Sequence, residues 1–163
     1  NCKMQMSILN SFDNFDRCHE LILRTNQFNI SHKPLSSEQI KSLIKKKENK
    51  FYEVSMSDRF GNYGVIGLLG AKIKEKTFEI TDFLESCRVF KRNVEDYLIR
   101  FILKKNIFKN KKGYLLINRN KKNIYVQDLF DNCKYLKKIN SKIYEIDQNY
   151  KFNELNNIKV KIN

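Results

Sequence analysis

The residues from Phe78 to Leu103, FEITDFLESCRVFKRNVEDYLIRFIL, decide the fold that the sequence predicts. The first part alternates imperfectly between apolar and polar residues, which is typical of a strand, with apolar Phe78, Ile80, Phe83 and Leu84. The last part has the spacing of an amphipathic helix, with apolar Val94, Tyr97, Leu98, Phe101 and Ile102. Between them lies a basic turn, Arg88–Asn93, and cations beside a helix start suit a phosphate or pyrophosphate. An ordinary connection with solvated cations would look the same, so the role of the turn stays open.

Composition predicts one globular domain over residues 1–163. Hydrophobic residues make up 41% of the chain and aromatic residues 12%, which is enough to form a core. The chain has five glycines and one proline, and no Gly/Ser linker divides it. It contains no apolar run long enough to span a membrane. The first residues show neither a signal-peptide pattern nor a start methionine, so we expect the chain to be part of a longer polypeptide.

Cysteine and histidine usage predicts a reduced protein of the cytoplasm without a metal site. The four cysteines, Cys2, Cys18, Cys87 and Cys133, are far apart in the sequence. His19 and His32 are the only histidines, and no zinc-ligand spacing occurs. A reduced intracellular compartment is the simplest interpretation of scattered single cysteines.

A net charge of +14 raises the question of nucleic acid. The excess is mostly lysine, scattered along a chain that is also rich in asparagine and isoleucine, a bias that an AT-rich genome imposes on protein surfaces. The densest basic segment, between Lys104 and Lys122, is poor in arginine and shows no nucleic-acid-binding motif. Nucleic-acid binding is therefore the third hypothesis, although the charge would attract any acidic partner at low salt.

The order of predicted elements indicates an α/β (α+β) fold with one mixed sheet. Strands are predicted at 2–9, 51–57, 65–74, 78–84, 114–117, 142–146 and 158–162, and helices at 15–25, 36–47, 94–103 and 124–136. Ser36, three residues before Gln39, forms a capping-box pattern at the start of the second helix. The hairpin loop from Asp58 to Gly64 is predicted to be longer than the tight types. The resulting order is β-α-α-β-β-β-α-β-α-β-β, and helices covering the faces of one sheet are the economical arrangement.

This order is similar to that of the GNAT-type acyltransferase fold, in which the turn between the fourth strand and the third helix binds the pyrophosphate of acyl-CoA. Four segments between Met4 and Ile146 more closely resemble the C-terminal domain of the FkbH-like family. They are HELILRTNQFN (19–29), DRFGNYGVIG (58–67), FLESCRV (83–89) and VEDYL (94–98). Members of that family are HAD-type glyceryl transferase/phosphatase proteins, which load glyceryl units onto acyl carrier proteins in polyketide pathways.

The resemblance implies a GNAT-like domain that uses an acyl-CoA or phosphopantetheine thioester and no metal. Its implied partner is an acyl carrier protein or a covalently linked HAD-type domain. The acidic DxD motif of the HAD part is missing from this sequence, so the phosphatase-like chemistry would lie on a preceding part of a longer protein. A stand-alone relative is the alternative.

Two departures from the family pattern bear on catalysis. The usual acyl-CoA loop is R/Q-x-x-G-x-G/A, and it aligns with Arg88-Val-Phe-Lys91-Arg-Asn93, so side chains stand where close backbone approach needs glycine. In the fourth helix, Phe130 occupies the place of the tyrosine that often protonates the leaving thiolate in such enzymes, and phenylalanine cannot donate a proton.

The predicted site draws on residues from several elements. Phosphates would be held by Arg88, Lys91, Arg92 and Asn93. The acyl part would be oriented by Asn26, Gln27 and Asn29, whose amides could instead satisfy loop backbone groups. Arg59 would meet a substrate carboxylate or pair with Asp58 to fix the hairpin loop. Glu85 or His19 would act as general base, although a structural hydrogen bond is the commoner role of such a histidine. Cys87 is expected to be a small buried residue on the strand rather than a nucleophile.

Two functions are compatible with these residues. The first is acyltransferase-type handling of an acyl or glyceryl thioester, for which we expect an open cleft beside Glu85 and the Arg88 turn. The second is a non-catalytic GNAT-fold module that docks an acidic carrier protein through its basic face. The lost glycines and Phe130 favour the second function, for which we expect a filled cleft.

Overall fold

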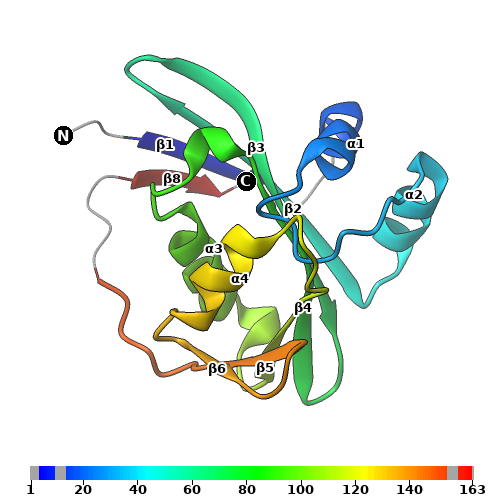
Figure 1. The fold of residues 1–163 in the computed structure, drawn as a ribbon, viewed down its shortest axis with the longest axis vertical. Coiled ribbons are helices and arrows are strands. Elements are labelled where there is room, and N and C mark those ends of the chain that lie inside the picture. Colours follow the sequence, from blue (N-terminus) through cyan, green and yellow to red (C-terminus); the bar gives the residue numbers. More distant parts are fainter. Residues whose placement is uncertain (1–3, 10–13, 154–157, 163) are drawn as a thin grey trace.

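The computed structural model describes residues 4–9, 14–153 and 158–162, and its centre is one mixed sheet (Figure 1). Within the described residues the sheet has eight strands in the order β6-β7-β5-β4-β3-β2-β1-β8. The strands are β1 (Met4–Leu9), β2 (Asn49–Asp58), β3 (Gly61–Ile73), β4 (Thr77–Glu85), β5 (Lys112–Leu116), β6 (Leu136–Lys138), β7 (Ile143–Ile146) and β8 (Ile158–Ile162). Strands β4–β5 and β1–β8 pair in parallel, and the other neighbours pair antiparallel.

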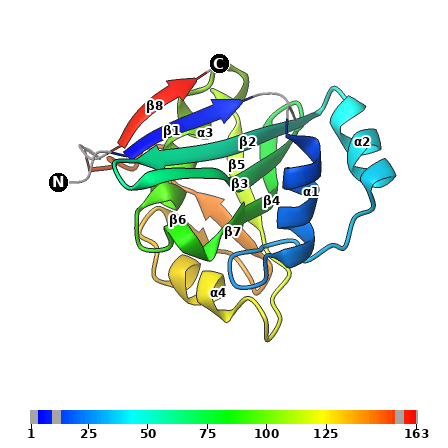
Figure 2. The same cartoon turned by 90° about the horizontal axis from the view of Figure 1, so that it is seen from above.

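Helices cover both faces of this sheet (Figures 1 and 2). On one side lie α1 (Phe15–Arg24) and α2 (Ser37–Lys45), and on the other lie α3 (Val94–Lys104) and α4 (Ile124–Asp131). Because side chains of a strand alternate between faces, neighbouring Val65 and Ile66 of β3 join different clusters. Val65 packs with Cys18 and Leu21 of α1, whereas Ile66 belongs to the main core under α3 and α4. The capping box predicted at Ser36 and Gln39 is confirmed at the start of α2.

Three sequence predictions need correction or lie outside the described residues. The β2–β3 hairpin turns tightly, since Asp58 pairs with Gly61 and only two residues separate them. The longer predicted loop is wrong because Asp58 Oδ1 accepts a hydrogen bond from the Phe60 amide and Gly61 adopts a φ of 151°, which glycine tolerates. Helix α4 ends at Asp131, and buried Leu136 begins strand β6 instead of extending the helix. Residues 2 and 3 of the first predicted strand lie outside the described part of the chain.

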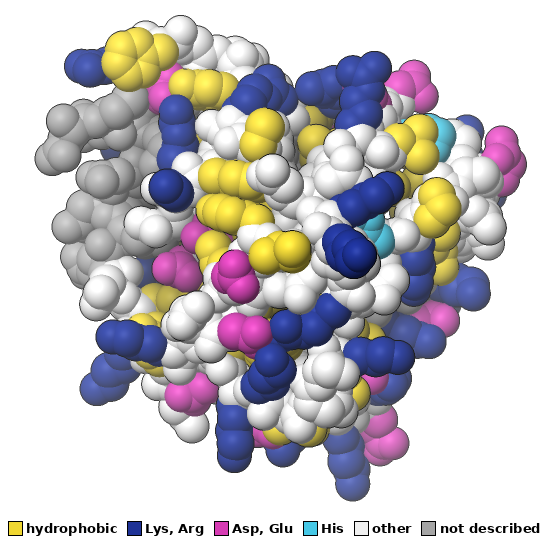
Figure 3. Space-filling view, viewed as in Figure 1, with side chains coloured by type: hydrophobic (Ala, Val, Ile, Leu, Met, Phe, Trp, Pro, Cys, Tyr) yellow, Lys and Arg dark blue, Asp and Glu magenta, His cyan; other side chains and the backbone are white. Residues whose placement is uncertain are grey.

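The excess positive charge does not gather in one place on the face that Figure 3 shows. Lysine and arginine side chains are scattered over this face, with acidic side chains between them. In the described part of the chain, no helix is both long enough and apolar enough to cross a membrane.

Candidate functional site

A cleft of about 470 Å³ lies where β4 ends, between helix α1 and the turn that leads to α3. Its walls come from α1, from the segment that follows α1, and from the residues after β4. The lining residues are Arg17, Glu20, Leu21, Arg24, Thr25, Asn26, Gln27, Phe28, Glu85, Ser86, Cys87, Arg88 and Phe90. The open cleft expected beside Glu85 and the Arg88 turn is therefore present, with a volume typical of small-ligand sites.

The turn between β4 and α3 has an unusual backbone. Lys91 and Asn93 adopt φ values of 63° and 58°, in the left-handed region that residues with a Cβ atom rarely enter. These are the two positions that align with glycines of the acyl-CoA loop. Asparagine tolerates this conformation, but for lysine it costs about 1 kcal/mol or more. The turn thus keeps a glycine-type conformation although its glycines are replaced.

The two arginines of the turn differ in their surroundings. Arg88 is exposed, and its Nε donates to Ser86 Oγ at 3.1 Å. Arg92 reaches back to the β2–β3 hairpin, where its Nη1 lies 3.0 Å from Asp58 Oδ2 and its guanidinium lies over the Tyr63 ring. The Asp58 side chain is only 1% exposed. Asp58 therefore pairs with Arg92, which links the hairpin to the turn, whereas Arg59 is exposed and stacks on Phe60.

Strand β4 diverges from β5 beyond Ile80, and a segment of the chain fills the gap. The strand has an extra residue at Thr81, because Ile80 pairs with Ala71 and Asp82 with Gly70, and such bulges bend a strand. Residues Phe28–Ile30 lie along the freed edge of β4. The Ile30 amide donates to the Phe83 carbonyl at 3.2 Å, and the Glu85 amide donates to the Phe28 carbonyl at 3.1 Å.

The segment Phe28–Ile30 is also tied to the far side of the gap. The amide of Asn118, beyond β5, donates to the Ile30 carbonyl at 2.8 Å. Asn123 is 0% exposed, and its Nδ2 donates to the backbone carbonyls of Asn29 and Asn118 at 2.9 and 3.0 Å. Phe28 is also 0% exposed and packs edge-on against Phe83. The segment is therefore held by hydrogen bonds to β4 on one side and to residues beyond β5 on the other.

The three predicted acyl-orienting amides are placed differently. Asn29 is buried and uses its side chain within the loop, since its Oδ1 accepts from the His32 amide at 2.9 Å and its Nδ2 donates to the Thr25 carbonyl at 3.0 Å. This is the structural alternative that the sequence left open. Asn26 and Gln27 are exposed and line the cleft, so their side chains are available to a ligand.

Glu85 lies at the inner end of the cleft and is 0% exposed. Neither of its carboxyl oxygens has a hydrogen-bond partner among the described residues. Burial, reinforced by nearby Glu95 and Asp96, raises the pKa of this carboxyl well above its usual 4.5. A carboxyl that keeps its proton can donate a hydrogen bond but cannot accept a proton as a base.

Of the remaining candidate residues, Cys87 lines the cleft, whereas His19 and Phe130 do not. His19 Nε2 lies 3.2 Å from the Leu35 carbonyl and its ring stacks on Phe15, so His19 joins α1 to the following loop and does not line the cleft. Cys87 was expected to be buried, and this expectation is wrong. Strand β4 ends at Glu85, so Cys87 begins a short 3₁₀ turn and is exposed on the cleft wall. Phe130 is buried in the core.

Sequence reasoning missed several residues that shape this region. Tyr125, at the start of α4, stacks on Phe90 with 4.2 Å between ring centroids, and Glu85 and Glu95 contribute to raising its pKa after burial. Tyr125 therefore brings a hydroxyl group near the buried carboxyl of Glu85. Phe130 has no hydroxyl and could not take this role. Arg17 and Arg24 line the cleft from α1. Their helical spacing of seven residues could have signalled a shared face with Glu20 between them.

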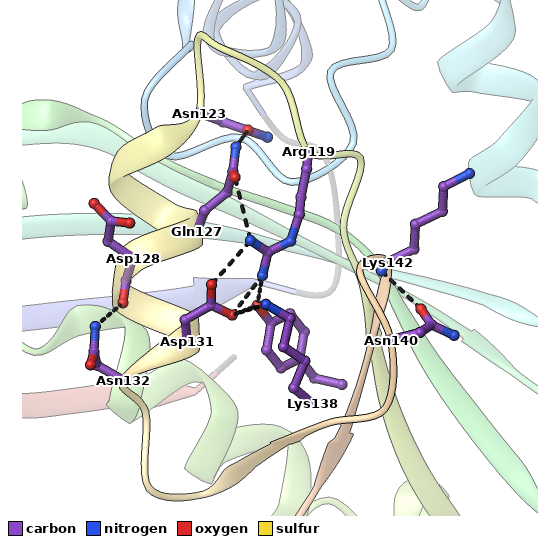
Figure 4. Close-up of polar contacts among 10 residues, drawn as sticks. Arg119, Asn123, Gln127, Asp128, Asp131, Asn132, Lys138, Asn140 and Lys142 are labelled. Carbon is purple, nitrogen blue, oxygen red and sulfur yellow. Dashed lines mark hydrogen bonds and ion pairs between the residues drawn. The ribbon is translucent and has the colours of Figure 1, made fainter.

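A separate polar cluster holds α4 against the sheet (Figure 4). Arg119 donates to both carboxyl oxygens of Asp131, at 3.0 and 2.6 Å, and contacts the buried Tyr144 hydroxyl. Hydrogen bonds from Arg119 hold the pKa of Asp131 well below its usual range. Lys138 also pairs with Asp131 at 2.9 Å. Although the buried Arg119 Nε has no hydrogen-bond partner among the described residues, the charged ends of these side chains pair with one another, and we assign the cluster a structural role.

No protein-family model matches the sequence, and a comparison with curated proteins finds no match. Solved structures do match the fold. A domain from Methanocaldococcus jannaschii is 19% identical, with a TM-score of 0.65 over 90% of this chain and 99% of that one. A mutant spermidine N-acetyltransferase from Vibrio cholerae is 16% identical, with a TM-score of 0.57 over 88% of this chain and 92% of that one.

A third match is the GCN5-related glucosamine N-acetyltransferase region of a fungal multi-domain β-N-acetylglucosaminidase. It is 13% identical, with a TM-score of 0.59 over 84% of this chain and 17% of that one. Identities this low show the fold alone. The chain therefore has the mixed α/β fold of GNAT acetyltransferases, as the order of its predicted elements indicated.

Proposed function

We propose that this chain is an acyltransferase-type domain that handles an acyl or glyceryl thioester on CoA or on the phosphopantetheine of an acyl carrier protein. The observation that supports this most directly is the backbone at Lys91 and Asn93, which keeps the left-handed conformation although both glycines are gone. Left-handed residues in a turn direct backbone N–H groups toward one point, where an anion can bind. The acyl carrier protein and a linked HAD-type domain enter the proposal through the FkbH-like resemblance.

The residues present fit the phosphate part of such a ligand. The turn would offer its backbone amides, and Arg88 a guanidinium that Ser86 holds at the rim of the cleft. Asn26 and Gln27 would orient the acyl part, which the bound thioester would supply in activated form. Glu85 would donate a hydrogen bond to a ligand oxygen, because its raised pKa keeps the proton in place. We assign it this role instead of the predicted role of general base.

A second candidate is a non-catalytic module that docks an acidic carrier protein through its basic surface. One observation favours it: the segment Phe28–Ile30 occupies the edge of β4 where an extended ligand arm would otherwise form backbone hydrogen bonds. To bind there, the ligand would have to displace a buried segment that is hydrogen-bonded to β4 on one side and to Asn118 on the other. If this segment never leaves, phosphates could still bind at the turn while the thioester stays outside.

Isothermal titration of the purified protein with acetyl-CoA and, in parallel, with a holo acyl carrier protein tests both candidates. The thioester site would be supported if acetyl-CoA binds, if Arg88→Ala abolishes this binding, and if Arg100→Ala leaves it unchanged. Arg100 is the control because it lies on α3 outside the cleft. Binding of the carrier protein without binding of acetyl-CoA would support the docking module. Absence of heat with both ligands would refute both candidates.

A further inference from the structure

The proportion of arginine to lysine among the residues that line the cleft differs from that in the whole chain. The sequence contains 25 lysines and seven arginines. Three of the seven arginines, Arg17, Arg24 and Arg88, line the cleft, and none of the lysines that the structure describes does. A composition that favours lysine over arginine throughout makes this local reversal informative. Arginine offers a planar fork of donors that matches carboxylate and phosphate oxygens, whereas lysine offers a compact point charge.

The charges in the cleft do not cancel. Arg17 and Arg24 share one carboxylate, since both pair with Glu20, and the Arg24 contact is 2.8 Å long. A hydrogen bond from Arg17 lowers the pKa of Glu20, so this carboxyl stays ionised. Arg88 contacts the neutral Ser86 hydroxyl and forms no ion pair among the described residues. Three cations therefore face the carboxylate of Glu20, and the raised pKa of the buried Glu85 carboxyl disfavours a second anion.

The cleft also has the other features of a ligand site. Leu21, Phe28 and Phe90 supply apolar surface, while Asn26 and Gln27 add amide groups at the rim. The Arg24 side chain is 79% exposed, so its guanidinium is free to reorient toward a ligand. A volume of about 470 Å³ accommodates a small molecule and is too small for a folded partner.

We propose that this cleft binds a small ligand through an oxyanion, a carboxylate or a phosphate, which Arg24 and Arg88 hold by bidentate hydrogen bonds. The binding claim stands on the arginines alone. Identifying the ligand as the acyl acceptor rests on the proposed function. In that role, the acidic acceptor would lie on the α1 side of Glu85 and the phosphates of the acyl donor on the turn at Lys91, and Arg88, between the two, would donate to both.

Alkylation of Cys87 by iodoacetamide measures occupancy of the cleft directly, because this thiol is exposed on the cleft wall. The rate is followed by peptide mass spectrometry, which separates Cys87 from the other cysteines. The probes are inorganic phosphate and succinate, with sodium chloride at equal ionic strength as the control. We expect saturable slowing of at least about fivefold by one or both probes and little effect of chloride, since bidentate contacts distinguish oxyanions from a spherical ion.

Three variants locate the effect. Arg24→Ala should raise the half-protecting concentration about tenfold, the equivalent of one charge-assisted hydrogen bond. Arg88→Lys keeps the charge but removes the fork, and it should weaken protection similarly. Arg100→Ala is the matched control outside the cleft and should leave protection unchanged. Arg24 is too exposed for its removal to endanger folding.

The outcomes separate this inference from the proposed function. Protection by phosphate alone or by succinate alone would support the site and identify its anion. Lack of protection, equal protection by chloride, or an equal loss with Arg100→Ala would overturn it. If protection of Cys87 depends on Arg24 but neither acetyl-CoA nor carrier protein binds, the oxyanion site is supported and the thioester function is refuted.

Discussion

Replacement of the buried carboxyl Glu85 by glutamine should remove the loss of stability that this group causes as the pH rises above its unfolded pKa. Glu85 has no exposed surface and no hydrogen-bond partner among the described residues, and the carboxylates of Glu95 and Asp96 lie nearby. Glutamine has nearly the same shape and remains neutral at every pH. The substitution therefore removes ionisation and keeps the packing, which isolates the electrostatic cost of this position.

The sign and size of the effect follow from proton linkage. The folded pKa of Glu85 is raised above the ordinary value of 4.5, so the folded state holds a proton that the unfolded state has lost. The stabilisation from this proton is fully present below pH 4.5 and is lost as the pH rises toward the folded pKa. In that window the wild type loses about 1.4 kcal/mol of unfolding free energy per pH unit, whereas Glu85→Gln does not titrate at this position. The variant therefore gains stability relative to the wild type as the pH rises from 5 to 7, by at most about 1.4 kcal/mol per pH unit.

Urea denaturation of both proteins at pH 5, 6, 7 and 8 measures this difference. A buried amide with unpaired N–H groups adds a constant cost of about 1–3 kcal/mol, so the test is the slope against pH and not the offset. Glu79→Gln, on the same strand but beside Lys74 at the surface, is the matched control and should show a small, constant difference. A difference for Glu85→Gln that stays flat or falls between pH 5 and 7 would refute the reasoning.

Three further predictions concern the turn, the filled gap and the cysteines. Lys91→Gly should raise the unfolding free energy by about 0.5–1 kcal/mol, because relief of the left-handed lysine exceeds the entropy cost of glycine; a loss in urea denaturation would contradict this. Asn123→Ala should cost about 2–4 kcal/mol, since buried carbonyls lose their donors, and should speed hydrogen exchange of the Ile30 amide; unchanged exchange would show that the segment is held without Asn123. In folded protein, iodoacetamide should modify Cys87 before Cys18, because burial raises the pKa of the Cys18 thiol; the reverse order in peptide maps would contradict the burial.

Local patterns account for the parts of the fold that the sequence predicted correctly. The capping box of Ser36 and Gln39 needs only residues three apart, and the apolar spacing from Val94 onward is a property of one helix. The strand, turn and helix between Thr77 and Lys104 were predicted for the same reason. Each of these elements carries its own signal, independent of what packs against it.

Long-range contacts decided the rest, and no local pattern encodes them. The partner of Arg92 is Asp58, 34 residues earlier. The prediction that Arg92 binds a ligand used only the neighbouring sequence, which does not reveal this pairing. Asn29 is buried because its segment pairs with β4, more than 50 residues later. The exposure of Cys87 depends on the residue at which β4 ends, and strand boundaries are the least certain part of a sequence-based prediction.

The contact between Asp58 and Arg92 also explains how the turn keeps its strained backbone. Arg92 stands between the two left-handed residues, Lys91 and Asn93, and the hairpin that carries Asp58 and Tyr63 anchors its guanidinium. Fixing Arg92 restricts the backbone of the residues on either side of it. The hairpin therefore holds Lys91 and Asn93 in the left-handed conformation, which glycine would merely allow. Asp58→Ala should therefore cost about 2–4 kcal/mol, because it leaves a partly buried guanidinium without its carboxylate.

A double-mutant cycle with Lys91→Gly tests whether this anchor and the strained turn are one unit. If the anchor forces lysine into the left-handed region, its removal lets the turn relax, and Lys91→Gly then gains less than in the wild type. We expect a coupling free energy of at least about 0.5 kcal/mol from urea denaturation of the four proteins. Arg59→Ala, which alters the same hairpin at an exposed position, should show no coupling to Lys91→Gly. Strict additivity in the Asp58 cycle would mean that the turn holds its conformation without the hairpin.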